Sequence, residues 1–126
     1  MKFTEFTEIK NILIVDDDPG CQLALQMMVQ KLFESAEIKI FNDGGEAFDY
    51  VNSEKSVDLV FTDINMPGLS GDQLAMKIKE KNKKVVIFGV SGMEPNEEFL
   101  KVFDCVLTKP ISLTSLNESL LKVLGK

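Results

Sequence analysis

Five short runs of apolar and β-branched residues recur along the chain, and helical spacing follows most of them. The runs cover residues 12–15, 38–41, 57–61, 85–90 and 105–107. Helical patterns follow in the stretch after residue 18 and around residues 45–52, 71–81, 95–102 and 112–124. Strands that alternate with helices predict βαβ units and a parallel sheet.

The helix after residue 18 has the clearest signals. Asp18 is suited to be its N-cap, and Pro19 to be its first residue. Behind them one apolar stripe repeats at helical intervals, formed by Cys21, Leu25, Met28, Val29 and Leu32. We therefore interpret Asp18 as a helix cap and not as a ligand. For the last helix, Ser112 is the predicted cap and Gly125 the predicted stop.

The apolar runs differ in a way that predicts their order in the sheet. Residues 12–15, 57–61 and 85–90 are nearly all apolar, as expected of central strands that helices cover on both faces. Run 38–41 alternates and run 105–107 is short, which indicates edge strands. The prediction is a single α/β domain, (βα)₅ and flavodoxin-like, with a parallel five-stranded sheet of order 2-1-3-4-5. We assign residues 9–126 to this domain and residues 1–8 to an N-terminal tail.

Polar residues follow four of the five runs. They are Asp16 and Asp17, then Asp63 and Asn65, then Ser91 and Gly92, and finally Thr108 and Lys109. In open parallel sheets, ligands bind beyond the carboxyl ends of the strands, so these groups are predicted to meet at one end. Separately they are ordinary turn residues or surface charges. Their placement at four strand ends favours a site.

The predicted site has a coherent chemistry. Converging carboxylates repel one another, and a divalent cation with oxygen ligands, Mg²⁺, Ca²⁺ or Mn²⁺, would relieve that repulsion. Mg²⁺ keeps positions free for phosphate oxygens. A lysine and a hydroxyl group would hold the other oxygens of a phosphoryl group, and an aspartate can attack phosphorus to form an acyl phosphate.

Composition narrows the function further. The chain has 126 residues, enough for one domain, and 14 lysines against 20 acidic residues give a net charge of −6. With no histidine, His-dependent nucleophilic catalysis and His-ligated zinc are excluded. Acidity argues against nucleic acid as a partner, and no apolar run approaches a membrane span or a signal peptide. Cys21 and Cys105 are interpreted as buried thiols of a cytoplasmic protein.

Four segments carry a resemblance to a known family. They are residues 12–19 (Ile-Leu-Ile-Val-Asp-Asp-Asp-Pro), 58–68 (Asp-Leu-Val-Phe-Thr-Asp-Ile-Asn-Met-Pro-Gly), 90–92 (Val-Ser-Gly) and 109–110 (Lys-Pro). In this order and spacing the chain resembles, over essentially its whole length, the receiver domain of response regulators in two-component signalling. The resemblance implies that a sensor histidine kinase or a histidine phosphotransfer protein donates a phosphoryl group to an aspartate, with Mg²⁺.

The resemblance also assigns roles to the residues at the strand ends. Asp63 becomes the phosphoacceptor and a metal ligand, with Asp17 as a direct Mg²⁺ ligand and Asp16 acting partly through water. The backbone carbonyl of Asn65 completes the metal ligands. Ser91 is the switch hydroxyl and Lys109 pairs with the phosphoryl group. The peptide bond that precedes Pro110 is expected to be cis.

Some positions depart from the family pattern or remain open. Val106 stands where the family usually has its switch aromatic, so another aromatic such as Phe103, or the loop after residue 90, would have to report phosphorylation. Met93 lies where the family tunes dephosphorylation, and we expect its apolar side chain to shield the acyl phosphate. Leu23 and Met27 lie off the core stripe of their helix. They are interpreted either as scattered surface residues or as a docking surface for the kinase.

The leading hypothesis is a signalling switch and not a turnover enzyme, with an unknown downstream protein as its target. One alternative is a Mg²⁺-dependent phosphatase or phosphotransferase with an aspartyl nucleophile. Such hydrolases require a second acidic residue two positions after the nucleophile, where this chain has Asn65. The other alternative is a scaffold that is never phosphorylated. It predicts the loss of Asp63, the acidic pair or Lys109, and all of these are present.

Overall fold

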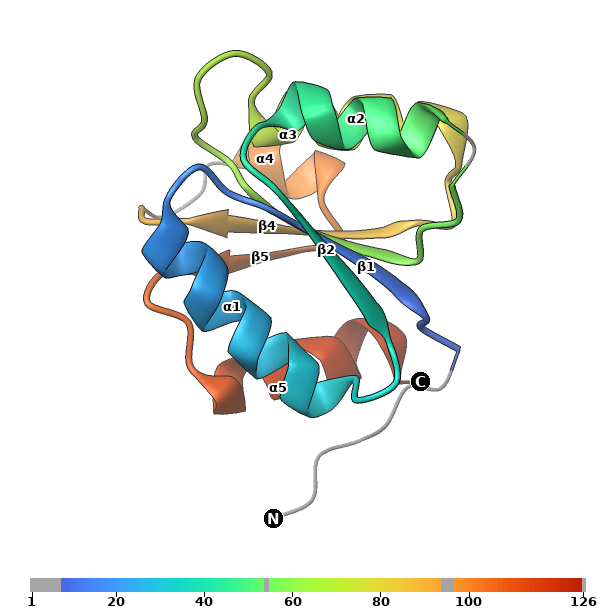
Figure 1. Cartoon of the computed structure of the whole chain (residues 1–126). Helices are drawn as coiled ribbons and strands as arrows, with labels where there is room; N and C mark the ends of the chain where they lie inside the picture. Colours follow the sequence, from blue (N-terminus) through green and yellow to red (C-terminus); the bar gives the residue numbers. More distant parts are fainter. Residues whose placement is uncertain (1–7, 54, 94–96, 126) are drawn as a thin grey trace.

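The computed structural model describes residues 8–53, 55–93 and 97–125, in which five strands and five helices alternate (Figure 1). In chain order the elements are β1 (Asn11–Val15), α1 (Pro19–Leu32), β2 (Glu37–Phe41), α2 (Gly44–Asn52), β3 (Leu59–Asp63), α3 (Gly71–Lys81), β4 (Val86–Ser91), α4 (Glu97–Val102), β5 (Cys105–Thr108) and α5 (Leu113–Leu124).

The five strands form one parallel sheet of order β2-β1-β3-β4-β5. Helices α1 and α5 cover one face, and α2, α3 and α4 cover the other (Figure 1). The predicted (βα)₅ architecture and strand order are confirmed. The predicted edges are confirmed as well, because β2 is only half-buried whereas all five residues of β3 are buried.

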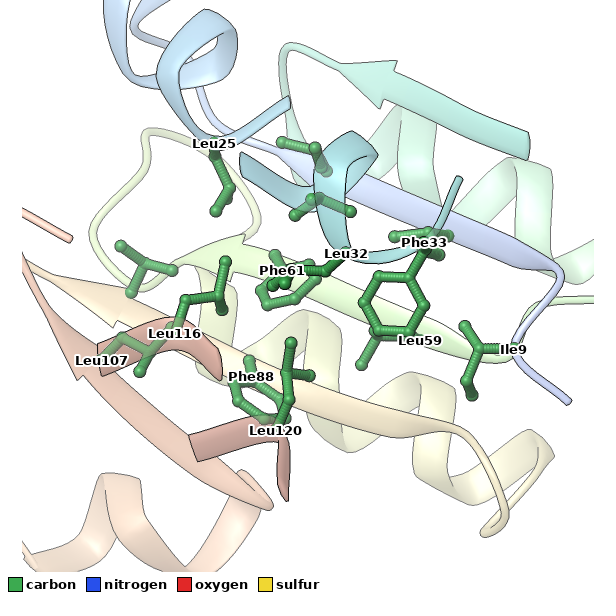
Figure 2. Close-up of a cluster of buried hydrophobic side chains, with 14 residues drawn as sticks. Ile9, Leu25, Leu32, Phe33, Leu59, Phe61, Phe88, Leu107, Leu116 and Leu120 are labelled. Carbon is green, nitrogen blue, oxygen red and sulfur yellow. The ribbon is translucent and has the colours of Figure 1, made fainter. Parts of the chain in front are cut away.

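Two apolar cores lie on the two faces of the sheet, because alternate strand residues point to opposite faces. Figure 2 shows the core beneath α1 and α5, where Phe61 and Phe88 pack with their ring centroids 5.2 Å apart. Leu13, Val60 and Ile87 belong to the opposite core, beneath α2 and α3. These rigid layers fix the positions of the strand ends.

Helix α1 begins as predicted. The Asp18 carboxylate accepts a hydrogen bond of 3.0 Å from the Cys21 amide, and Pro19 is the first helical residue. Leu25, Val29 and Leu32 are buried, whereas Cys21 and Met28 are only half-buried. Cys21 and Cys105 are free thiols, as predicted, but both are only partly buried, so the prediction that they are buried is wrong.

Most boundaries differ from the prediction by about one residue, and at two ends of elements the structure shows a physical reason. Strand β3 begins at Leu59 and not at Val57, because the Asp58 carboxylate accepts hydrogen bonds of 2.9 Å from the backbone amides of Lys10 and Asn11. Val57 still packs in the core. Helix α5 starts after Ser112, which caps it as predicted. Gly125 is its C-cap with φ −95°, so the left-handed conformation of a glycine stop is not adopted.

The predicted tail overlaps the described residues only at Glu8, and residues 1–7 lie outside them. Ile9 is buried in the core under α1 and α5, and the division into tail and domain stays a prediction. Among the described residues, no helix combines the length and the hydrophobicity that crossing a bilayer requires.

Candidate functional site

Four acidic and basic side chains meet at the carboxyl end of the sheet. Asp16 and Asp17 follow β1, Asp63 is the last residue of β3, and Lys109 follows β5. Carboxylate oxygens of the three aspartates lie within 4.8 Å of one another. The Lys109 Nζ atom lies 3.4 Å from Asp16 Oδ2 and 3.8 Å from Asp63 Oδ2. The structure therefore brings together the predicted acidic residues and the predicted lysine.

Backbone and side-chain hydrogen bonds hold the acidic loop after β1. The Asp16 amide donates to the Phe41 carbonyl at 3.1 Å, which extends the pairing with β2. The Asp18 amide donates to Asp16 Oδ1 at 2.9 Å. From α1, the Gln22 side-chain amide donates to the Asp16 carbonyl and, at 2.8 Å, to Asn42 Oδ1. Gln22 therefore ties this loop to the segment between β2 and α2.

The loop after β3 is held equally closely. The Ile64 amide donates to the Val90 carbonyl at 3.0 Å, and the Asn65 amide points to Asp63 Oδ1 at 3.4 Å. A Cβ atom at Gly71 would lie 2.2 Å from the Asp63 carbonyl oxygen. Only glycine allows α3 to start so close to the end of β3. The backbone of Asp63 thus packs closely against a residue eight positions later.

Ser91 lies at the site, but its hydroxyl group faces its own loop. The side chain is buried, and Oγ donates to the Met93 carbonyl at 2.8 Å and accepts from the Met93 amide at 3.1 Å. Asn65 is exposed at the rim. Both residues border the acidic cluster without a side-chain hydrogen bond to it among the described residues. The predicted cis bond between Lys109 and Pro110 is confirmed.

The surroundings of Asp63 disfavour its charge. Burial raises the pKa of Asp63, and the Asp16 carboxylate adds to this, whereas Lys109 opposes it. For Lys109, burial would lower the pKa, but the Asp16 and Asp63 carboxylates outweigh burial and raise it. Lys109 is therefore a stable cation that balances only part of the negative charge.

This set of donors matches a hard divalent cation. Three carboxylates that face one lysine leave a net negative charge, and oxygen donors suit Mg²⁺, Ca²⁺ or Mn²⁺. Asp16 and Asp63 are buried and Asp17 is exposed, so the cluster is open to water on one side. Mg²⁺ retains water and phosphate oxygens among its ligands and uses such half-open sites.

Comparison with known proteins assigns the family. The response regulator receiver domain family matches residues 12–121. The chain belongs to this family. The sensor histidine kinase RcsC of Salmonella typhi is 31% identical to this receiver domain over 113 residues, which are 86% of this chain and 12% of that protein. The chain thus spans about an eighth of the length of such a relative.

Solved structures agree with this assignment. The response regulator TrrA of Thermotoga maritima, in complex with Mg²⁺-BeF, superposes with a TM-score of 0.80 at 31% identity and covers 92% of this chain and 100% of its own. TrrA in complex with the histidine kinase ThkA gives a TM-score of 0.78, also at 31% identity, and covers 92% of this chain and 99% of that chain.

The positions that depart from the family pattern have definite surroundings. Val106 is half-buried on β5 opposite Gly89. Phe103 is buried, and a Cβ atom at Gly89 would lie 3.0 Å from its ring. Phe103 is thus a core residue that packs on β4. On α1, Leu23 and Met27 are 58% and 61% exposed, as their place off the core stripe predicts.

Sequence reasoning missed two residues that position the site, Gln22 and Gly71. Gln22 is a polar residue on a helix, and its bonds to Asp16 and Asn42 span 6 and 20 positions. Nothing local in the sequence indicates them. Gly71 follows a loop that contains another glycine, Gly68, so its close contact with Asp63 emerges only when β3 and α3 are packed.

Proposed function

We propose that this receiver domain accepts a phosphoryl group on Asp63 from the phosphohistidine of a sensor histidine kinase or a histidine phosphotransfer protein. The observation that carries the proposal is the position of the Asp63 carboxylate, which ends β3 among Asp16, Asp17 and Lys109. The ThkA–TrrA complex supports a kinase as the donor. Because the chain has no histidine, the donor imidazole comes from another protein or domain.

In the transfer step, an Asp63 carboxylate oxygen attacks the phosphorus atom. The new oxygen–phosphorus bond forms as the nitrogen–phosphorus bond of the phosphohistidine breaks. The leaving imidazole nitrogen keeps the electron pair and takes up a proton from water. Lys109 Nζ, already within 3.8 Å of Asp63, holds a phosphoryl oxygen and stabilises the added charge.

Asp16, Asp17 and Asp63, together with the backbone carbonyl of Asn65, would hold the metal ion. Mg²⁺ supplies positive charge that stabilises the phosphoryl oxygens in the transition state. Support comes from the three carboxylates within 4.8 Å and from the complex of TrrA with Mg²⁺-BeF. In this proposal Asp17, which is exposed, binds the ion directly, and Asp16, which is buried and already bonded to the Asp18 amide, acts partly through water.

We propose that the chain is a conformational switch and not a turnover enzyme. In the unphosphorylated protein, the Ser91 hydroxyl is bonded to the Met93 backbone. A phosphoryl group on Asp63 offers it charged oxygen acceptors, which form stronger hydrogen bonds than a neutral carbonyl. Moving the hydroxyl frees the Met93 backbone, and an unknown downstream protein in the cytoplasm would read this change. Val106, half-buried on β5, has no aromatic ring that could reorient, so the backbone after Ser91 carries the signal.

The exposed side chains of Leu23 and Met27 support a docking surface for the donor on α1. Leu23→Glu should slow phosphotransfer from a histidine kinase and leave phosphorylation by acetyl phosphate unchanged. Equal transfer from the kinase to both proteins would refute the docking surface. It would not affect the assignment of Asp63.

The test is intact mass after incubation with Mg²⁺ and acetyl phosphate. We expect a gain of one hydroxylamine-labile phosphoryl group, which is absent from Asp63→Asn and after chelation of the metal. Binding of Mg²⁺ without any gain would indicate a domain that accepts only from its own kinase. Neither gain nor Mg²⁺ binding would contradict the proposal and favour the scaffold.

A further inference from the structure

The positive charge of the chain is concentrated in one segment. Residues 77–84 contain five of the 14 lysines and one acidic residue, so this segment has a net charge of +4 and the rest of the chain −10. The segment forms the last turns of α3 and the start of the connection to β4. A charge distribution this uneven gives the surface a strong local field.

Two of these lysines have partners within the fold. Lys79 Nζ lies 2.8 Å from Asp104 Oδ2, and Lys77 Nζ lies 5.3 Å from the centroid of the Phe48 ring. Lys81, Lys83 and Lys84 are exposed and form no ion pair with the described residues. The negative end of the α3 dipole explains a lysine at position 81, but it does not explain positions 83 and 84, which lie beyond the helix.

Three lysines surround a hollow of about 340 Å³ at this end of the molecule. Lys81 lines it from the end of α3, Lys84 from the connection to β4, and Lys55 from the segment after α2. Its apolar lining consists of Val51, Val57 and Val85, all part of the core under α2 and α3. The acidic residue in its lining is Asp58, whose carboxylate is already bonded to the amides of Lys10 and Asn11.

The hollow lies at the opposite end of the sheet from Asp63. Val57 and Asp58 directly precede β3 and Val85 precedes β4, whereas Asp63 ends β3. The length of β3, at roughly 3.3 Å per residue, separates the two ends. A molecule in the hollow would therefore not cover the phosphorylation site.

We infer that this hollow, lined by Lys55, Lys81 and Lys84, binds a short acidic segment of a partner protein. Carboxylates would pair with the three lysines, and an aliphatic side chain of the segment would lie over the valine floor. A long nucleic acid or an anionic membrane would also face the remaining surface, whose net charge of −10 repels it. A short acidic segment would contact only the basic end of the molecule, around the hollow, and would avoid this repulsion.

The test is an NMR titration of the ¹⁵N-labelled chain with a peptide of sequence Glu-Asp-Glu-Val-Glu-Asp-Glu, blocked at both ends. We expect amide shifts that concentrate in residues 55–58 and 81–85. The triple variant Lys55→Gln/Lys81→Gln/Lys84→Gln should bind about 3- to 100-fold more weakly, the range for three exposed ion pairs. Higher salt should weaken the binding to the unmodified chain.

The matched control is Lys31→Gln/Lys39→Gln/Lys122→Gln, which removes the same charge from exposed lysines elsewhere. It should bind within about twofold of the unmodified chain, since distant exposed charges are largely screened. Both variants should gain the phosphoryl group from acetyl phosphate as before. An equal loss of affinity in the control, shifts spread over all lysines, or no shifts at millimolar peptide would overturn the inference. Equal or tighter binding of an oligothymidine of the same charge, or of phosphatidylserine vesicles, would also overturn it.

Discussion

Neutralising Asp63 should stabilise the metal-free protein, although it abolishes the proposed phosphorylation. Asp63 is only 8% exposed, and carboxylate oxygens of Asp16 and Asp17 lie within 4.8 Å of its own carboxylate. With an effective dielectric constant of about 20, repulsion from one charge at 4.8 Å is about 3.5 kcal/mol. Attraction to Lys109 at 3.8 Å is about 4.4 kcal/mol.

Asp17 is exposed, so water screens most of its repulsion. The repulsion from Asp16 nearly cancels the attraction to Lys109, so the loss of hydration of the carboxylate remains uncompensated. The hydrogen bond from the Asn65 amide, at 3.4 Å, is long and weak and replaces little of the lost hydration energy. Asparagine has the same shape without the charge. We therefore expect Asp63→Asn to raise the free energy of unfolding at pH 7 by about 1–2 kcal/mol.

The gain should depend on pH. Burial and the Asp16 carboxylate raise the pKa of Asp63 in the folded protein above the ordinary value of 3.8. Between these two pKa values the native state holds the proton more often than the unfolded state, so the stability of the unmodified protein falls as the pH rises through this window. The advantage of Asp63→Asn is complete above the folded pKa and vanishes below pH 3.8.

Urea unfolding in the presence of a chelator, from pH 7 downwards, measures this difference. Asp49→Asn on the exposed face of α2 is the control and should change the unfolding free energy by less than about 0.5 kcal/mol. The reasoning is refuted if Asp63→Asn is less stable than the unmodified protein at pH 7. It is also refuted if a gain persists undiminished below the ordinary carboxyl pKa.

Three further predictions concern residues around the site. Gly71→Ala should lower the unfolding free energy by about 1–3 kcal/mol in urea, since its Cβ would meet the Asp63 carbonyl at 2.2 Å; unchanged stability would contradict the close contact. Gln22→Ala should weaken Mg²⁺ binding about tenfold by calorimetry, because the Asp16 carbonyl loses its donor, and an unaltered affinity would show that the loop holds itself. Met93→Glu should speed loss of the phosphoryl group from Asp63 in a decay assay, and identical decay would disprove shielding by Met93.

The fold could be predicted because the pattern of apolar residues in each run indicates whether the strand lies at the centre or at the edge of the sheet. All five residues of β3 are buried, whereas β2 contains only half-buried and exposed residues, which distinguishes a centre from an edge. The start of β3 was misplaced because the Asp58 side chain, and not an apolar residue, ends the preceding segment by binding the amides of Lys10 and Asn11. Such bonds join residues almost fifty positions apart and leave no local pattern.

The site could be predicted as far as strand ends determine it. Asp16, Asp63 and Lys109 meet because parallel strands end at one edge. The orientation of the Ser91 hydroxyl group could not be predicted. Its hydrogen-bond partner is a backbone carbonyl, and the position of that carbonyl is known only once the loop is folded. The partial exposure of Cys21 could not be predicted either, because the apolar stripe of α1 does not show how deeply each of its residues is buried.

The identity of the phosphorylated residue tests the central claim most directly. After incubation with acetyl phosphate and Mg²⁺, reduction with borohydride converts an aspartyl phosphate into homoserine, and peptide mass spectrometry locates it. We predict homoserine at position 63 alone, and none when the metal is chelated. Homoserine at Asp16 or Asp17, with Asp63 intact, would contradict the assignment of Asp63 as the phosphoacceptor.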